Sequence, residues 1–309
     1  MSISDAIRID VRRRAAALLA ARHQLFAGYL ALRYSKHVTF DAPIINREIK
    51  HIVVIRLDSL GDFILSTPLW RELRSALPNT EITAVVSAST LNIAQRIPFF
   101  DNVVPFESEM LLPTPFDQIS AWNRARAFSE SQLRPRIPDI VLLPRWDISN
   151  AAEPAIAFHS GARIRVGYSE HVTRLKSIKN RNYDRLLTHL VPEGLQFHDV
   201  LRNLDALRVL TQRPAINTNL QAWHGDKERS VAMSTISQWR SPSRPLLAIG
   251  PGAALGRRRW PVERYSEVVK SLSKSVDAQF IIVGGPHDTQ LGEMLTRNMV
   301  KPEDTLDLT

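Results

Sequence analysis

Residues 52–68 constrain the fold of this chain more than any other stretch. Residues 52–55, Ile-Val-Val-Ile, are consecutive apolar residues, a pattern typical of a strand buried on both faces of a parallel sheet. A short polar loop follows, and an apolar pattern with helical spacing then runs through Leu65, Leu69 and Leu73. Such a strand–loop–helix unit places its loop at the carboxyl end of the sheet, where open α/β sheets bind their ligands.

The loop contains Ser59, Gly61 and Asp62. We expect Gly61 to supply backbone freedom and Asp62 to lie at or near the start of the helix. An aspartate at that place has two interpretations. It caps the helix, because Asp is a favoured N-cap residue, or it acts chemically at the ligand-binding edge. Pro68 falls inside the apolar helical pattern, and we expect it to kink that helix.

Strands and helices alternate along the rest of the chain, as in a doubly wound parallel sheet. After the first unit, the pattern predicts strands at 81–86, 102–106, 139–143 and 163–168, and helices at 91–97, 117–132, 151–159 and 197–210. Residues 211–245 are polar and proline-rich, and form a boundary that includes one helix at about 226–239. A second α/β unit follows, with strands at 246–249 and 279–283 and helices from 261 and at about 289–300.

Composition narrows the classes of function. The 309 residues include no cysteine, which excludes disulfides, zinc sites built on cysteine, and thiol catalysis. No apolar run approaches the roughly 20 residues that span a bilayer, and no signal peptide is recognisable, so we expect a cytoplasmic location. The net charge of +9 would suit a nucleic-acid ligand. No nucleic-acid motif accompanies that charge, and we expect no nucleic-acid partner.

Basic charge concentrates in the first fifty residues, which hold nine Lys and Arg against four acidic residues, a difference of +5. Apolar residues recur there at helical spacing: Ile7, Val11, Leu18, Leu25, Tyr29 and Leu32. A basic amphipathic helix can lie on an anionic membrane surface, or dock on its own protein with the basic face in water. We favour the membrane surface and expect a peripheral protein.

Short motifs in both halves of the chain occur in one order. The first half contains Ser59-Leu60-Gly61-Asp62 and Thr67-Pro68, and the second contains Pro251-Gly252-Ala253, Arg259-Trp260-Pro261, Glu263-Arg264 and Gly284-Gly285-Pro286. Together, over about residues 52–286, they resemble the heptosyltransferases (glycosyltransferase family 9), which build the inner core of lipopolysaccharide. The resemblance implies an α/β GT-B-like architecture of two doubly wound Rossmann-type domains.

The resemblance divides the chain into three parts. Residues 1–50 are the basic amphipathic extension, 51–212 a Rossmann-like acceptor-side domain, and 213–309 a partial Rossmann-like domain for the nucleotide sugar donor. The second domain has two predicted strands, and the sequence ends where another strand should begin. Family members continue with an Asp-Ser/Thr-Gly…His segment at the donor. We therefore expect the second domain to be incomplete and the chain to be a fragment or a truncated product.

The resemblance implies that Asp62 is the catalytic base that takes the proton of the acceptor hydroxyl. The acceptor-side candidates are Ser59, Gly61, Arg145 and Asp147. Arg145-Trp146-Asp147 also suits a structural loop in which the tryptophan fills an interface. The candidates for binding the donor diphosphate are Gly252, Arg258, Arg259, Gly284 and Gly285. The family usually has Lys where Arg259 stands, and Arg keeps the charge. A run of arginines before a helix can also be simply solvated.

The sequence has neither the Asp-x-Asp triplet nor the His-Glu-x-x-His motif that binds a metal ion. The first loop has a single glycine, so it matches neither the dinucleotide-binding fingerprint nor a P-loop. We therefore expect a metal-independent reaction without a cofactor. The resemblance implies inverting transfer of a heptose-like sugar, from ADP-heptose, to a lipopolysaccharide core or a related lipid-linked glycan. The alternative is an inactive, truncated relic or a membrane-surface binding module that does not bind the donor.

Overall fold

The computed structural model describes residues 25, 27–32, 48–107, 115–149, 152–191, 198–212, 217–253, 256–299 and 301–309. The chain forms two compact units, Met1–Trp223 and His224–Thr309. The boundary predicted between residues 212 and 213 is therefore too early. The segment before Trp223 packs on the first unit: the N–H of Gln221 donates to Thr67 Oγ1 (3.1 Å), and Trp223 makes an edge contact with Phe99.

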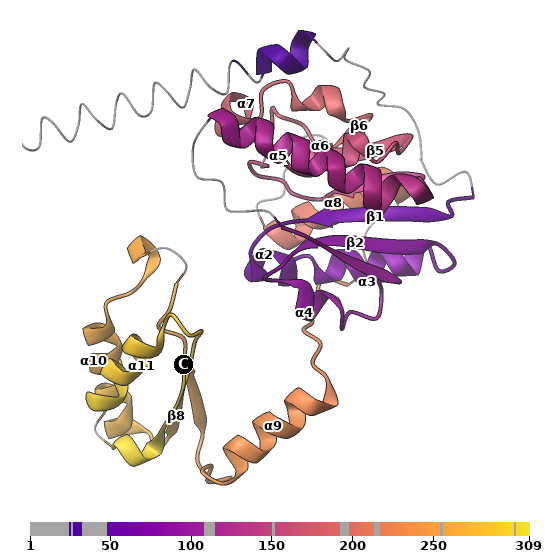
Figure 1. Ribbon diagram of the computed structural model, residues 1–309. Coiled ribbons are helices and arrows are strands. Elements are labelled where there is room, and N and C mark those ends of the chain that lie inside the picture. The colour runs from indigo at the N-terminus through magenta and orange to yellow at the C-terminus, as the bar shows by residue number, and fades with distance from the viewer. Residues whose placement is uncertain are drawn as a thin grey trace, which may run out of the picture. The chain divides into compact units, whose positions relative to one another are not determined.

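The first unit is built on a parallel sheet with the strand order β3-β2-β1-β4-β5-β6 (Figure 1). Its strands are β1 His51–Arg56, β2 Glu81–Ser87, β3 Asn102–Phe106, β4 Ile140–Leu143, β5 Ile164–Tyr168 and β6 His189–Val191. The chain adds β2 and β3 on one side of β1 and then returns to add β4 on the other side. The strand order therefore reverses between β1 and β4, and the crevice at their carboxyl ends is the expected ligand site of such a sheet.

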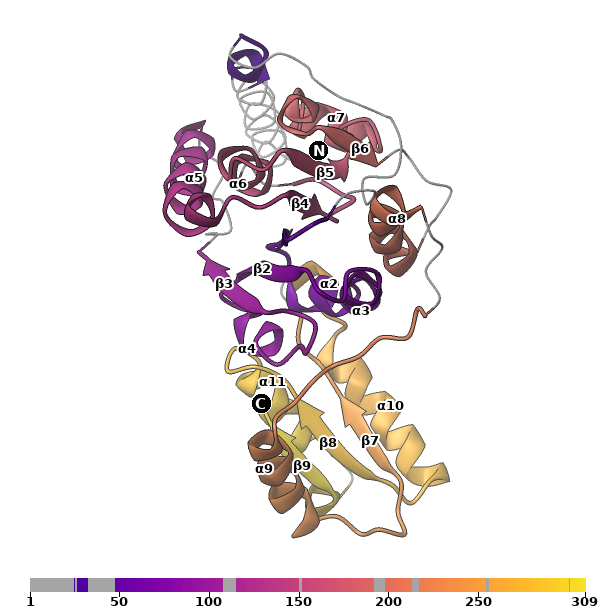
Figure 2. The same ribbon diagram turned by 90° about the vertical axis from the view of Figure 1, so that its right-hand side faces the viewer.

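Helices cover both faces of this sheet (Figure 2). They are α2 Leu60–Ile64, α3 Thr67–Ala76, α4 Leu91–Ala94, α5 Pro115–Phe128, α6 Ala152–His159, α7 Arg174–Lys179 and α8 Asp199–Thr211. Side chains alternate along β1: Ile52 and Val54 share a core with α3 and α8, whereas Val53 and Ile55 share a core with α5 and α6. Residues 52–55 are all apolar because both faces of the strand are buried.

The helical pattern after β1 forms two helices rather than one. α2 ends at Ile64, and α3 begins at Thr67 with Ser66 as its N-cap residue. Pro68 lies in the first turn of α3, where its missing N–H has no intrahelical partner to lose. The expected kink inside a single helix is therefore wrong, because the proline helps to start a new helix.

One predicted helix differs from the structure at its ends, and two elements of the structure were not predicted. The predicted helix 117–132 is α5 followed by a π-helical turn, Ser129–Leu133, and a 3-10 turn, Arg134–Arg136. No element was predicted where α7 and β6 lie. β6 has three residues and pairs with β5, and so short a strand shows no alternation that could be recognised in the sequence.

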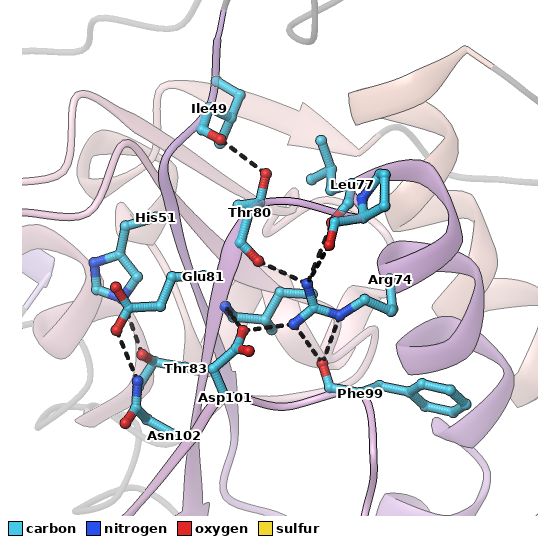
Figure 3. Close-up of polar contacts among 12 residues, drawn as sticks. Ile49, His51, Arg74, Leu77, Thr80, Glu81, Thr83, Phe99, Asp101 and Asn102 are labelled. Carbon is cyan, nitrogen blue, oxygen red and sulfur yellow. Dashed lines mark hydrogen bonds and ion pairs between the residues drawn. The ribbon is translucent and has the colours of Figure 1, made fainter.

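At the amino end of the sheet, Arg74 of α3 forms hydrogen bonds with residues before β2 and before β3 (Figure 3). Its guanidinium donates to the carbonyls of Thr80 (2.7 Å) and Phe99 (3.0 Å) and to Asp101 Oδ2 (2.5 Å). The same Asp101 oxygen accepts from the N–H of Ile82 on β2 (2.7 Å). Arginine suits this place because its rigid fork donates in several directions at once. This cluster lies at the edge opposite the expected ligand site, so its role is structural.

Much of the predicted extension over residues 1–50 lies outside the described residues, which there are 25, 27–32 and 48–50. Residues 27–32 are helical. Ala27 and Leu30 are buried, and Asn182 Nδ2 donates to the carbonyl of Ala27 (2.9 Å). Leu25 and Leu32, which belong to the predicted apolar stripe, are exposed. The described part therefore docks on the first unit, and it does so through Ala27 and Leu30 rather than through those two leucines.

The second unit has a parallel sheet of three strands in the order β7-β8-β9: Leu246–Ile249, Gln279–Val283 and Thr305–Leu308. Two strands were predicted, and β9 corrects that prediction, since four residues suffice to pair with β8. The helices of this unit are α9 Asp226–Ser237, α10 Val262–Ser275 and α11 Thr289–Arg297, and 3-10 turns lie at Gly256–Arg258 and Pro302–Asp304. The first unit also has a 3-10 turn at Tyr183–Leu186. None of the helices in the described ranges is long and apolar enough to cross a bilayer.

Candidate functional site

Asp62 lies in the first turn of α2, just after the carboxyl end of β1. Ser59 is the N-cap residue of this helix, so the cap predicted at Asp62 belongs to Ser59 instead. The Ser59 hydroxyl donates to Asp62 Oδ2 (2.7 Å). The fold thus places a partly buried carboxylate, held at one oxygen, at the edge of the sheet where the strand order reverses.

Gly61 lies in the same turn of α2, in ordinary helical backbone. The backbone freedom expected of this glycine is therefore not needed. A Cβ built on Gly61 would have no heavy atom within 4 Å outside its chain neighbours. A side chain at Gly61 would instead extend into open space at this exposed position.

A buried ion network joins the carboxyl ends of β1 and β4. Asp58, which follows β1, pairs with Arg56 Nε (2.7 Å) and with Arg145, which follows β4. Arg145 Nη1 lies 3.5 Å from Glu153 Oε1 in the first turn of α6. Arg56, Asp58 and Glu153 are all buried. Sequence analysis identified Arg145 alone among these four residues and did not identify its partners.

Burial and neighbouring charges together shift the pKa values of groups in and around this network. Desolvation raises the pKa of Glu153, although Arg145 opposes the shift. Burial by itself would lower the pKa of Arg145, but Glu153 and Asp58 outweigh it and raise that pKa. Lys176 of α7 donates from Nζ to the carbonyls of Trp146 (3.0 Å) and Tyr168 (3.3 Å), and burial lowers its pKa to about 8.

The residues that were predicted for the acceptor side differ in their surroundings. Ser59, Gly61 and Asp62 lie together at the start of α2. Arg145 is engaged by Asp58 and Glu153, with 27% of its side chain exposed, whereas Asp147 is exposed. Trp146, between these two residues, stacks under the Arg202 guanidinium, whose Cζ lies 3.6 Å from the ring centre. The tryptophan therefore packs within the first unit.

In the second unit, glycines predicted for the donor side gather around Asp288, at the carboxyl ends of β7 and β8. The N–H of Gly285 donates to Asp288 Oδ2 (3.1 Å). A Cβ on Gly252 would lie 2.3 Å from that same oxygen, and one on Gly284 would lie 2.9 Å from Asp288 Cβ. A side chain at either position would therefore require Asp288 to shift, at its carboxylate for Gly252 and at its Cβ for Gly284. Sequence analysis missed Asp288, whose only signal was its place just before a helix.

The two predicted arginines differ in their surroundings. Arg259 Nε donates to the carbonyl of Ala253 (3.2 Å), and its Nη2 lies 3.8 Å from Asp288 Oδ1, so this side chain lies at the glycine cluster. Arg258 is exposed, as is Arg259. Within the part of the chain that is described, no group of three or more His, Asp or Glu side chains is placed to hold a metal ion.

No family model matches the chain. A curated protein of Haemophilus influenzae, whose name describes it as a glycosyltransferase, is 20% identical over 250 residues. The match covers 77% of this chain and 65% of the relative. The chain thus spans less than two thirds of the length of that relative.

Solved structures are similar over a larger share of this chain. A glycosyltransferase family 9 protein from Veillonella parvula matches 86% of this chain and 71% of its own, with a TM-score of 0.68 and 20% identity. The chain has a GT-B-like fold. Escherichia coli heptosyltransferase WaaC with ADP matches 84% of this chain and 74% of its own (TM-score 0.55, 16% identity), and E. coli ADP-heptose heptosyltransferase II matches 84% and 72% (0.54, 17%). The heptosyltransferase-like architecture that the motifs predict is confirmed at the level of the fold.

Proposed function

We propose that this protein is a glycosyltransferase that moves a heptose-like sugar from a nucleotide diphosphate sugar to a hydroxyl group, with inversion and without a metal ion. One observation carries the proposal: the partly buried Asp62 carboxylate stands at the carboxyl edge of β1 and is held at Oδ2 by Ser59. The structural similarity supports the choice of donor, since E. coli WaaC structures contain ADP and ADP-2-deoxy-2-fluoro heptose. ADP-heptose is therefore the first donor to test.

In the proposed reaction, Asp62 Oδ1 accepts the proton of the acceptor hydroxyl, because Oδ2 already accepts from Ser59. The acceptor oxygen bonds to the anomeric carbon while the bond from that carbon to the diphosphate oxygen breaks, and the electron pair leaves with the nucleoside diphosphate. A single displacement inverts the anomeric centre. Arg258 and Arg259, with the loops of Gly252, Gly284 and Gly285, would stabilise the charge on the diphosphate.

The remaining parts of the proposal concern the acceptor. We assign the first unit to the acceptor side, with Arg145 and Asp147 at its edge, and the second unit to the donor. The acceptor would be a lipopolysaccharide core or a related lipid-linked glycan at the inner face of the cytoplasmic membrane. The excess positive charge of residues 1–50 supports this assignment, because basic segments are attracted to anionic lipid.

The variant Asp62→Asn tests the proposed base. Asparagine keeps the size of the side chain and an oxygen for Ser59 to bind, but it does not accept the proton. With ADP-heptose and a lipid-linked core acceptor, we expect kcat to fall by about 10²- to 10⁴-fold, while ADP affinity by calorimetry stays unchanged. Asp226→Asn, which alters an exposed carboxylate on α9, is the matched control and should keep full activity.

The possible results separate the parts of the proposal. Full turnover by Asp62→Asn would refute the role of Asp62. A product with retained anomeric configuration by NMR would refute inversion, and loss of activity in EDTA would refute metal independence. No binding of ADP by the unaltered chain would favour the alternative, an inactive relic or a membrane-surface binding module.

A further inference from the structure

The helix that carries Asp62 is too short to hold its own orientation. α2 has five residues, and isolated helices of this length are unstable because nucleation costs more than one turn of hydrogen bonds returns. Its side-chain supports come from elsewhere in the chain. Ser66 Oγ donates to the carbonyl of Asp62 (2.9 Å), and Arg56 Nη2 donates to the same carbonyl (3.4 Å).

A second support holds the end of α2. Asn203 of α8 donates from Nδ2 to the carbonyl of Leu65, the C-cap residue (3.1 Å). Its Oδ1 accepts from Arg56 Nη1 (3.1 Å), so the two supporting side chains also bind each other. Asn203 is 2% exposed and Arg56 is 6% exposed. Together they link the end of β1 and the second turn of α8 to both ends of the segment that runs from Asp62 to Leu65.

Arg56 is itself held in place by charge. Its Nε pairs with Asp58 (2.7 Å), and Asp58 pairs in turn with Arg145 at the end of β4. Burying such pairs costs desolvation energy, and well-packed apolar side chains often stabilise a core as much or more. The preceding residues of β1, 52–55, are all apolar. The buried guanidinium is therefore better explained by the groups it orients than by stability.

We propose that Arg56 and Asn203 are positioning residues that set the orientation of Asp62 toward the acceptor hydroxyl. The inference rests on the proposed function for the role of Asp62, but not for the anchoring of α2. Neither side chain is placed to take part in proton transfer. They act through the carbonyls of Asp62 and Leu65, which fix the backbone from which the carboxylate projects.

Two variants of Asn203 divide its two hydrogen bonds. Asn203→Ala removes both, whereas Asn203→Asp keeps an acceptor for Arg56 but loses the donor to Leu65. Because a misplacement of about 1 Å can cost about 100-fold in rate, we expect Asn203→Ala to lower kcat by about 10- to 100-fold. The KM for the donor should stay unchanged, and Asn203→Asp should recover part of the loss.

Hydrogen exchange measures the anchoring without any need for activity. In Asn203→Ala, we expect the amides of residues 60–66 to exchange faster, while those of β2 stay protected. Arg74→Lys is the matched control. It weakens a similar arginine cluster at the opposite edge of the sheet, so it should lower the unfolding temperature but change neither kcat nor exchange in residues 60–66.

The outcomes distinguish this inference from the proposed function. If the unaltered chain transfers sugar and Asn203→Ala changes neither kcat nor exchange in residues 60–66, the positioning role is wrong while the function stands. If Asn203→Ala raises exchange in α2 but the unaltered chain transfers no sugar from ADP-heptose, the anchoring is supported and the proposed function fails. A fall in kcat that Arg74→Lys reproduces at equal loss of stability would reduce the role of Asn203 to general stability and overturn the inference.

Discussion

Lys176 gives a quantitative test of the electrostatics around the candidate site. This residue is 3% exposed, and its ammonium group donates to the carbonyls of Trp146 and Tyr168. Burial lowers its pKa from the ordinary 10.5 to about 8, although Glu153 and Asp184 oppose the shift. At about 1.4 kcal/mol per pKa unit, the buried charge costs about 3 kcal/mol of folding stability at pH 7.

The sign of the pH dependence follows from proton binding. Below pH 8, Lys176 is protonated in both the folded and the unfolded chain, so the cost is present in full. Between pH 8 and 10.5 the folded chain releases this proton while the unfolded chain still holds it, so the free energy of unfolding rises with pH. Lys176→Met lacks this titration, but leaves two buried carbonyls without their donor at every pH, at a cost of about 1–3 kcal/mol.

The predicted quantity is the difference in unfolding free energy between the unaltered chain and Lys176→Met. It should grow in favour of the unaltered chain by about 3 kcal/mol from pH 7 to above pH 10. Urea unfolding followed by tryptophan fluorescence measures it, with Trp239 and Trp260 changed to Phe in both proteins so that the first unit alone reports. Groups that titrate in both proteins cancel in the difference. Parallel stability curves across this pH range would refute the reasoning.

Two further predictions concern the second unit and the N-terminal residues. Gly252→Ala forces the Asp288 side chain to move, because a Cβ there would lie 2.3 Å from its Oδ2. We therefore expect the free energy of unfolding of the second unit to fall by about 1–3 kcal/mol in thermal unfolding. We also expect ADP to bind more weakly by calorimetry. Gly256→Ala, where a Cβ meets nothing within 4 Å, should leave the unfolding temperature unchanged, and equal effects of the two variants would contradict this explanation. Changing Arg12, Arg13 and Arg14 to Gln should lower the affinity for phosphatidylglycerol vesicles, measured by sedimentation, by about 100-fold. The reason is that each basic residue near an anionic surface contributes about 1 kcal/mol to binding. Equal sedimentation of both proteins, or equal binding to neutral vesicles, would argue against an electrostatic membrane contact.

Several strands that the sequence predicted well have a strong burial pattern, although β3 and β7 were predicted with equal accuracy and are only partly buried. β1, β2, β4 and β8 are runs of apolar residues, because the sheets bury them from both sides. The structure corrects the prediction where length or context decides. β6 is too short to show a pattern. Pro68 was predicted to kink one helix, but the first helix ends before Leu65 and a new helix begins after Ser66. Local sequence does not reveal that break, since the apolar spacing continues across it.

In the candidate site, the sequence could identify residues in a local motif but not residues whose contacts depend on how the strands pair. The sequence alone could single out Asp62 because its motif is local and lies just after a strand. The pairing of Asp58 with Arg145 is not local, because it depends on β4 lying next to β1. Asp288 was missed for a related reason: its approach to Gly252 forms only when β7 and β8 are side by side, although its bond with the N–H of Gly285 is local.

The buried network nevertheless left two signals in the sequence. Arg56 ends a strand that is otherwise apolar along residues 52–55, and Glu153 lies within an apolar helix, α6. A charge in a segment that must be buried needs a partner of opposite sign. Had the strand order 3-2-1-4-5-6 been assumed, the carboxyl ends of β1 and β4 would have been neighbours, and Arg56, Asp58, Arg145 and Glu153 would have fallen at one edge. Combining the expected topology with charges that interrupt apolar segments would therefore have identified the network, although the supporting bonds of Asn203 to α2 require the side-chain geometry itself.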